Sequence, residues 1–181
     1  MSTHGVSEYE GRIERILDLK NKNLWVELGR PSTPWPNENI PPSPVPGAAD
    51  VETPYLYLKG TFKTLCRPAA TDQEYEAAGA NSVMIGSSKY IFIADADAYT
   101  ESARWLFVKV TVDVANGHPA GTYRQVRLFG ELEAALGHES ETWLLPGNVT
   151  SPGKRIWTDT CPPEIVTSAA RKSALILIES T

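Results

Sequence analysis

The feature that most limits how this chain can fold is a proline-rich segment that directly follows a strand-like run of residues. Seven prolines lie between Pro31 and Pro46, and Trp35 lies among them. Because proline has a fixed φ, lacks an N–H and restricts the residue before it, the segment can be neither a helix nor a central strand, and an extended polyproline II conformation is expected. A flexible linker, a ligand for proline-binding domains and an ordered surface arm all have this composition, so the remaining sequence has to decide between them.

The first part of the chain has the pattern of a short amphipathic helix over residues 6–20. Ser7 can serve as the N-cap of a capping box, S-E-Y-E. Ile13, Ile16 and Leu17 follow at the three- and four-residue spacing of one apolar face. A helix of this length is not stable alone, so we expect this face to be covered by the core of the chain or by another subunit.

From Leu24 onward the apolar pattern changes to the period of two that is typical of strands. One or two helical turns are expected over residues 67–81. The expected strands are 24–29, 55–65, a hairpin over 82–94, 104–114, 122–134, 154–160 (ended by Pro162 and Pro163) and 173–180. No strand–helix–strand alternation is seen. We therefore predict a mainly β fold, an antiparallel β sandwich or barrel-like domain with a short N-terminal helix and an extended proline-rich arm.

This pattern divides the chain into an N-terminal helical segment, residues 1–23, and a single β domain, residues 24–181, which carries the proline-rich arm at residues 30–54. A length of 181 residues, a hydrophobic content of 41% and five tryptophans fit one folded domain with an appendage.

The strand at 104–114 gives the clearest prediction of the core. Its alternation places only aliphatic residues on one face, so we expect that face to be buried. Those residues are Leu106, Val108, Val110 and Val112. Trp25 and Trp105, on other strand positions, are expected on an outer or rim face.

Composition excludes several classes of partner. A formal net charge of −5, with basic residues scattered along the chain, disfavours a nucleic-acid-binding role, which needs a concentrated positive face. No run approaches the roughly 18 apolar residues that span a bilayer, so no membrane partner is expected. Cys66 and Cys161 have no metal-ligand spacing, and we expect two buried free thiols, with a disulfide as the alternative.

The residues with catalytic potential do not form a recognisable motif. His4, His118 and His138 have no sequence neighbour that indicates a nucleophile or a triad. Asp95 and Asp97 follow an apolar run and could hold a divalent cation with Glu101, but a solvated turn is the favoured interpretation. We expect neither catalysis nor a cofactor.

Trp35 cannot lie in a sheet, because Pro34 and Pro36 flank it. It either anchors the proline segment to its own domain or inserts into a partner. The residues alone leave both possibilities open.

Two segments together resemble a known family. In "LGRPSTPWPNENIPPSPVP" a strand ends in Gly-Arg, and Pro-Trp, an amide or acidic residue and a Pro-Pro-x-Pro run follow. These positions are Gly29, Arg30, Pro34, Trp35, Asn37, Glu38, Pro41, Pro42 and Pro44. The second segment begins with an aromatic-Arg-Gln triplet. The triplet is Tyr123, Arg124 and Gln125. After it come a glycine at Gly153, a strand at residues 155–157, a proline pair with an aliphatic residue at residues 162–165 and a last strand at residues 174–178.

Both segments resemble baseplate wedge proteins of contractile-tailed bacteriophages, in a compact version. The larger proteins have a long additional middle. Their asparagine-arginine before the proline pair is replaced here by residues 159–161.

The resemblance implies a structural subunit of the virion that is assembled in the bacterial cytoplasm. Its partners would be other tail or baseplate proteins, and it would form a homo-oligomer within a six-fold assembly. The proline segment would be an ordered arm that docks with little loss of entropy. The candidate interface residues are Trp35, Arg30, Pro41, Pro42, Ile13, Ile16 and Leu17.

Two alternatives use other chemistry. A β-sandwich binding module or fibre-adaptor domain would recognise carbohydrate or peptide through exposed tryptophans. A small metal-dependent hydrolase would be built around Asp95 and Asp97.

Overall fold

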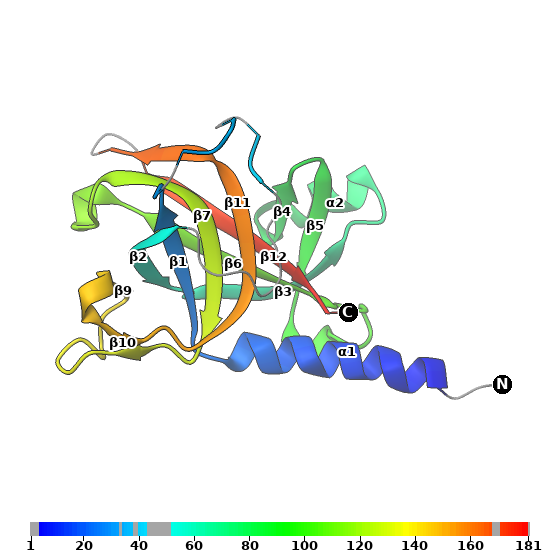
Figure 1. Ribbon diagram of the computed structural model, residues 1–181. Coiled ribbons are helices and arrows are strands. Elements are labelled where there is room, and N and C mark those ends of the chain that lie inside the picture. The colour runs from blue at the N-terminus through cyan, green and yellow to red at the C-terminus, as the bar shows by residue number, and fades with distance from the viewer. Residues whose placement is uncertain (1–3, 33, 38–39, 43–51, 168–170, 181) are drawn as a thin grey trace. The chain divides into compact units, whose positions relative to one another are not determined.

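A computed structural model describes residues 4–32, 34–37, 40–42, 52–167 and 171–180 (Figure 1). It confirms a mainly β protein with antiparallel strand pairs and a short N-terminal helix. The helices are α1 (His4–Asn21) and α2 (Asp72–Ala78), with single 3-10 turns at Gly79–Asn81, Asp95–Asp97, Val114–Asn116 and Pro146–Asn148. The strands are β1 (Leu24–Arg30), β2 (Thr53–Lys59), β3 (Phe62–Pro68), β4 (Ser82–Ile85), β5 (Ser88–Ile93), β6 (Trp105–Val112), β7 (Gly121–Gly130), β8 (Glu133–Ala134), β9 (Trp143–Leu144), β10 (Val149–Ser151), β11 (Lys154–Val166) and β12 (Lys172–Glu179).

The chain forms two compact units. Unit 1 comprises Met1–Lys22, Thr61–Lys109 and Leu175–Thr181, and unit 2 comprises Asn23–Gly60 and Val110–Ala174. The predicted division into a helical segment, 1–23, and one β domain, 24–181, concerns which parts fold independently, and it remains a prediction.

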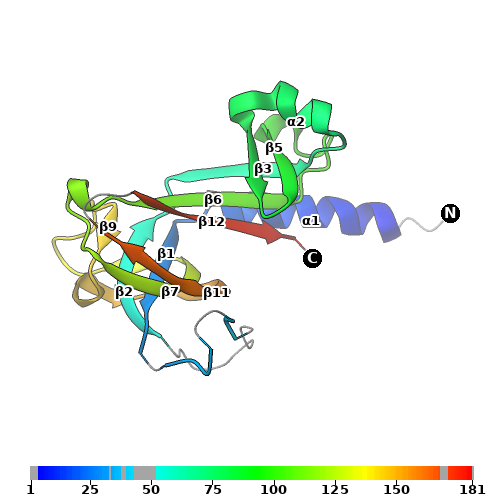
Figure 2. The same cartoon turned by 90° about the horizontal axis from the view of Figure 1, so that it is seen from above.

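Unit 1 is built on a five-stranded sheet in the order β12-β6-β3-β5-β4. Figure 2 shows β3 and β6 side by side in this sheet. Helix α1 packs against β3: Ile13 and Ile16 are buried, Leu17 is half-buried, and Lys63 Nζ donates to the carbonyl of Lys22 over 2.7 Å. The apolar face of the helix is therefore covered by its own subunit.

Unit 2 contains a five-stranded sheet in the order β11-β7-β1-β2-β9 and the short pair β10-β8. The long strands β7 and β11 are strongly curved in Figure 1, as in a barrel-like sheet. An apolar cluster of Trp25, Tyr57, Leu132 and Leu144 packs within this unit.

The predicted core of β6 is confirmed. Leu106, Val108, Val110 and Val112 are all buried, whereas Lys109 between them is exposed. Trp105 is half-buried, as expected for an outer position, but Trp25 is buried, contrary to the rim position predicted for it. The reason is that Trp25 packs in an apolar cluster with Tyr57, Leu132 and Leu144, on a strand that is paired on both sides by β7 and β2.

The structure corrects two strand predictions. Residues 55–65 do not form one strand, because β2 ends at Lys59, β3 begins at Phe62 and the two belong to different sheets. The strand expected to end before Pro162 runs on to Val166. Thr160 pairs with Gln125 and Glu164 pairs with Tyr123, so residues 161–163 bulge opposite a single residue of β7. Since β11 is an edge strand of its sheet, prolines in the bulge remove no necessary hydrogen bond.

Candidate functional site

The described part of the arm is attached to unit 2 by Trp35. This side chain is 9% exposed, and its ring lies under the guanidinium of Arg124, with 4.1 Å between the Arg124 Cζ and the ring centroid. Of the two possibilities left open by the sequence, Trp35 takes the first, because it anchors the arm to its own unit. A cation over a tryptophan ring that is shielded from water is one of the stronger contacts of this kind.

The two ends of the arm meet at one carboxylate, that of Glu52. Its Oε2 accepts hydrogen bonds from the backbone N–H of Ser32, at 2.8 Å, and from the Ser32 hydroxyl, at 3.3 Å. Its Oε1 accepts from Arg124 Nε at 2.7 Å. Glu52 therefore joins the start of the arm to its end, and both to the centre of the sheet.

A second ion pair lies beside the first. Arg127 Nη2 donates to the carboxylate of Glu27, its cross-strand partner on β1, and to the backbone carbonyl of Glu52 at 3.1 Å. All four charged side chains are buried. Burying charges is costly unless they are paired, so removing a single partner from such a set typically costs about 3–5 kcal/mol. We call these four residues, with Trp35 and Ser32, the arm base.

Gly29 makes room for the arm base. A Cβ at this position would lie 2.9 Å from the Glu52 Cβ and 3.1 Å from the Gln125 Cβ, both closer than ordinary contact. The glycine at the end of β1 in the family-like motif is thus explained by close packing of the arm's end against β1 and β7.

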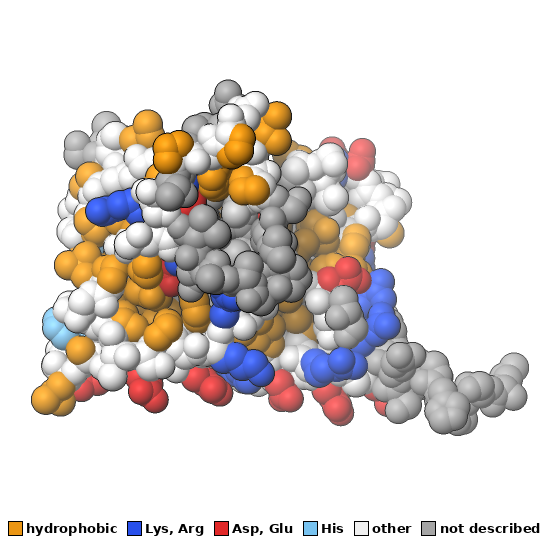
Figure 3. All heavy atoms as spheres, viewed as in Figure 1, with side chains coloured by type: hydrophobic (Ala, Val, Ile, Leu, Met, Phe, Trp, Pro, Cys, Tyr) orange, Lys and Arg blue, Asp and Glu red, His pale blue; other side chains and the backbone are white. Residues whose placement is uncertain are grey.

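The outer side of the arm is exposed and apolar. Ile40 is 68% exposed, and Pro36 and Pro42 are also exposed. In Figure 3 hydrophobic side chains gather at the top of the view, where Figure 1 draws the described part of the arm. The carbonyl of Pro42 accepts a hydrogen bond from the Thr160 hydroxyl on β11, at 2.6 Å, which gives the arm a second attachment.

The remaining candidate interface residues have the following surroundings. The Arg30 guanidinium lies 4.9 Å from the Tyr55 ring centroid, and Pro41 is half-buried. Glu38 and Pro44 of the family-like motif lie outside the described residues. Ile13 and Ile16 belong to unit 1, so the two groups of candidates lie in different units. Contacts of any of these residues with another subunit remain a prediction.

Asp95 and Asp97 form a 3-10 turn, as the favoured interpretation of the sequence expected. Asp95 is ion-paired with Lys20 at the end of α1. Within the described ranges, no group of three or more histidine, cysteine, aspartate or glutamate side chains could hold a metal ion.

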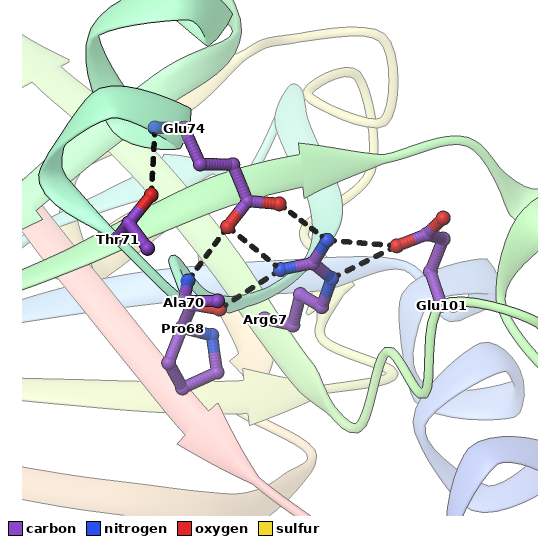
Figure 4. Close-up of polar contacts among 6 residues, drawn as sticks. All are labelled: Arg67, Pro68, Ala70, Thr71, Glu74 and Glu101. Carbon is purple, nitrogen blue, oxygen red and sulfur yellow. Dashed lines mark hydrogen bonds and ion pairs between the residues drawn. The ribbon is translucent and has the colours of Figure 1, made fainter.

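Glu101, the third residue considered for a cation, belongs to a different network. Figure 4 shows Arg67 between two carboxylates, with Nη2 at 2.7 Å from Glu74 Oε1 and at 2.8 Å from Glu101 Oε2. Glu74 also accepts from the Ala70 N–H at 2.6 Å, and its own N–H donates to Thr71, the N-cap of α2. The arginine holds the pKa of Glu74 below its usual range, through a side-chain hydrogen bond. The network fixes the β3–α2 connection.

The side chains of the other titratable candidates have structural contacts. His118 Nδ1 accepts the N–H of Asp113 at 3.0 Å, and burial lowers the pKa of His118 although Asp113 opposes the shift. His138 lies 3.0 Å from a Glu141 carboxylate oxygen. Cys66 and Cys161 form no disulfide; Cys66 is buried, whereas Cys161 is only half-buried. Burial raises the pKa of the Cys66 thiol to about 12 and that of the Cys161 thiol to about 11, so neither is a ready nucleophile.

Sequence reasoning missed Glu27, Glu52 and Arg127. The available signal for Glu27 and Arg127 was a charged residue flanked by apolar residues within a strand, as in L-W-V-E-L and V-R-L-F; Glu52 precedes β2 and carries no such signal. Such a residue is either solvent-facing or paired in the core, and only the fold decides between these cases.

None of the helices in the described part of the chain has the length and apolar character needed to cross a membrane.

Comparison with known proteins agrees with the family-like motifs at both ends. The family described as "baseplate wedge 3 tail fiber network component" matches residues 5–179. The chain is also 32% identical, over 152 residues, to "virion protein 3" of Enterococcus phage phiEF24C, and this alignment covers 82% of the chain and 80% of that protein. The resemblance to baseplate wedge proteins is thereby confirmed, and the chain belongs to the family of baseplate wedge 3 tail fiber network components.

Proposed function

We propose that this protein is a structural subunit of the baseplate of a contractile phage tail, that it acts through protein–protein contacts during tail assembly, and that it has no catalytic role. The family and the virion protein it resembles support a phage tail structural role. The observation that carries the proposal further is the arm base. There Glu52, at the end of the arm, accepts hydrogen bonds from Ser32 at its start and from the buried Arg124.

An arm held in this way is suited to docking. Ser32, Trp35 and Pro42 are held in place before a partner arrives, so the described part of the arm loses little conformational entropy on binding. Trp35 points inward to Arg124, whereas Ile40 and Pro42 are exposed to a neighbour. The partners are other tail or baseplate proteins, within a six-fold assembly in which the subunit is itself a homo-oligomer. Assembly takes place in the host cytoplasm and the product is the virion.

The binding-module alternative receives less support. It requires exposed tryptophans, but all five lie within the described residues and are buried or half-buried. No observation favours the hydrolase.

Complementation of a phage that lacks the gene tests the proposal. Ile40→Asp places a charge on the exposed side of the arm and should leave the melting temperature unchanged while preventing incorporation into tails. Leu136→Asp is the matched control, because Leu136 is an exposed leucine of the same unit outside the arm. Infectious particles with complete baseplates from the Ile40→Asp protein would show that the arm has no part in assembly.

A further inference from the structure

Strand register places five aromatic side chains on one side of the unit 1 sheet. Cys66 on β3 pairs with Phe92 on β5 and with Trp105 on β6, so these three side chains point to the same side. Side chains two positions apart along a strand share a side. We call the resulting set the aromatic face: Phe62, Tyr90, Phe92, Trp105 and Phe107.

The aromatic side chains are in contact with one another. Ring centroids are 5.8 Å apart for Phe62 and Phe92, 5.9 Å for Phe62 and Phe107, and 5.3 Å for Phe92 and Phe107. Tyr90 and Trp105 form a second pair at 6.5 Å. The phenylalanine group spans three neighbouring strands, and the Tyr90–Trp105 pair lies on the same side of β5 and β6.

This face is more exposed than the opposite side of the sheet. The opposite side carries Leu65, Leu106 and Val108, all fully buried, and Lys63, which reaches the Lys22 carbonyl just beyond α1. On the aromatic face Cys66 and Phe107 are also buried, but Tyr90, Phe92 and Trp105 are half-buried and Phe62 is 46% exposed. A sheet with one solvated face normally alternates apolar and polar residues, and an exposed apolar patch marks an interaction site.

The apolar surface continues on β12. Thr111 lies on the same side of β6 as Trp105, and its hydroxyl is 3.0 Å from that of Ser173, which places Ser173 and then Leu175 on this side. Leu175 is 40% exposed. The surface therefore extends from β5 to the edge strand β12.

The charges of this face and of the arm are complementary. Lys109 is exposed and pairs in register with Phe62. Between residues 31 and 49 the sequence has one charged residue, Glu38, and no basic residue. Proline-rich segments are bound by aromatic-lined surfaces, because the proline rings pack on aromatic side chains and the extended backbone loses little entropy.

We infer that the aromatic face of unit 1 receives the proline-rich arm of a second copy of this chain. Each copy offers one arm and one aromatic face, so two copies can exchange arms as a two-fold dimer, and copies joined head-to-tail close into a ring when the rotation between subunits allows it. The inference deepens the proposed function by naming a second copy as a partner. The arm could instead serve tail assembly through a different protein, so the inference can fail while the proposed function stands.

Photo-crosslinking of the full-length protein tests the inference directly. A benzophenone amino acid replaces Ile40, and isotopically light and heavy chains are mixed before irradiation. We expect light–heavy crosslinks to peptides that contain Phe62 or Phe92. Crosslinks confined to one chain, crosslinks elsewhere on the second chain, or no crosslinked dimer at any protein concentration tested would overturn it.

Sedimentation with variants supplies the energetic test. Phe62→Asp should weaken self-association about tenfold or more, the effect expected of a central aromatic contact. Lys109→Glu should weaken it less and serves as the second variant if Phe62→Asp fails to fold. Met84→Asp, which alters a residue 55% exposed on the opposite side of the same sheet, should have no effect.

Equal self-association of Lys109→Glu, Met84→Asp and the unaltered chain would contradict the inference. Loss of tail incorporation without loss of self-association would leave the arm's partner as another tail protein.

Discussion

The arm base in unit 2 and the Arg67 network in unit 1 use the same chemistry, arginine bonded to glutamate, but water reaches only the second. Arg124 and Glu52 are buried, whereas the side chain of Glu101 is 41% exposed. In water each ion of a pair can be hydrated when its partner is lost; in the interior it cannot. The buried network is therefore costly to break and holds Ser32 and Glu52 against Arg124. The exposed network holds a local loop and has little effect on global stability.

The largest expected effect comes from breaking the arm base. Glu52→Ala leaves Arg124 buried without its carboxylate, so we expect a loss of about 3–5 kcal/mol in the free energy of unfolding and a fall of roughly 10 °C in melting temperature. Hydrogen exchange of the Ser32 amide should also become faster, because its acceptor is removed.

Glu133→Ala is the matched control, since Glu133 is an exposed glutamate of the same unit. A double variant, Glu52→Ala with Arg124→Met, should lose less than the sum of the single losses, because no unpaired charge stays buried. Equal melting temperatures for the Glu52→Ala and Glu133→Ala proteins would mean that the comparison between the two networks is wrong.

The next effect is steric. Gly29→Ala forces a Cβ to within 2.9 Å of the Glu52 Cβ, so the arm's end or β7 must move. Overpacking of this kind typically costs about 1–3 kcal/mol. Gly11→Ala, in α1, is the control, because a Cβ there would meet nothing within 4 Å. Denaturant unfolding of both variants measures the difference, and a Gly29→Ala protein as stable as the unaltered chain would show that the arm base is loosely packed.

The residues of β6 and of the arm base show what could and could not be predicted from the sequence. The alternation of β6 predicted its buried face, because a period of two with only aliphatic residues on one side has one physical solution. The arm base could not be predicted in this way. Glu27 and Arg127 are 100 positions apart, and the pairing of β1 with β7 brings them together. Glu52 and Arg124 are 72 positions apart, and they meet because β1 pairs with β2, which Glu52 precedes, as well as with β7.

The strand prediction at 55–65 failed for a related reason. Strand-like residues continue on both sides of Gly60 without a turn signal, and this pattern does not show that the two halves join different sheets. Likewise, the sequence left two possible environments for Trp35, and only the fold places Arg124 over its ring.

A smaller effect is expected from the exposed network. Arg67→Ala removes the hydrogen bonds to Glu74 and Glu101 but leaves both carboxylates accessible to water. We expect a melting temperature close to that of the unaltered chain and a rise in the pKa of Glu74, which the arginine now lowers. Carbon-13 NMR titration of the Glu74 carboxyl measures the second quantity. A loss of stability as large as that of Glu52→Ala would contradict the distinction between the two networks.

The smallest effect concerns His118 in unit 2, which is half-buried and so lies between the buried arm base and the exposed Arg67 network. Burial lowers the pKa of His118 in the folded protein below its ordinary value, and its neutral Nδ1 accepts the N–H of Asp113, which is ion-paired with Arg171 at 2.6 Å. The folded state therefore binds the proton of His118 less readily than the unfolded state does. The contribution of neutral His118 to the free energy of unfolding is fully present above the unfolded pKa, about 6.5, and is lost as the pH falls through the folded pKa. Melting temperatures measured between about pH 7 and pH 5 should therefore fall more for the unaltered chain than for His118→Phe, in which the ring contact with Trp143 can persist without a titrating nitrogen. Groups common to both proteins cancel in this difference. Parallel pH profiles would show that protonation of His118 is not coupled to folding.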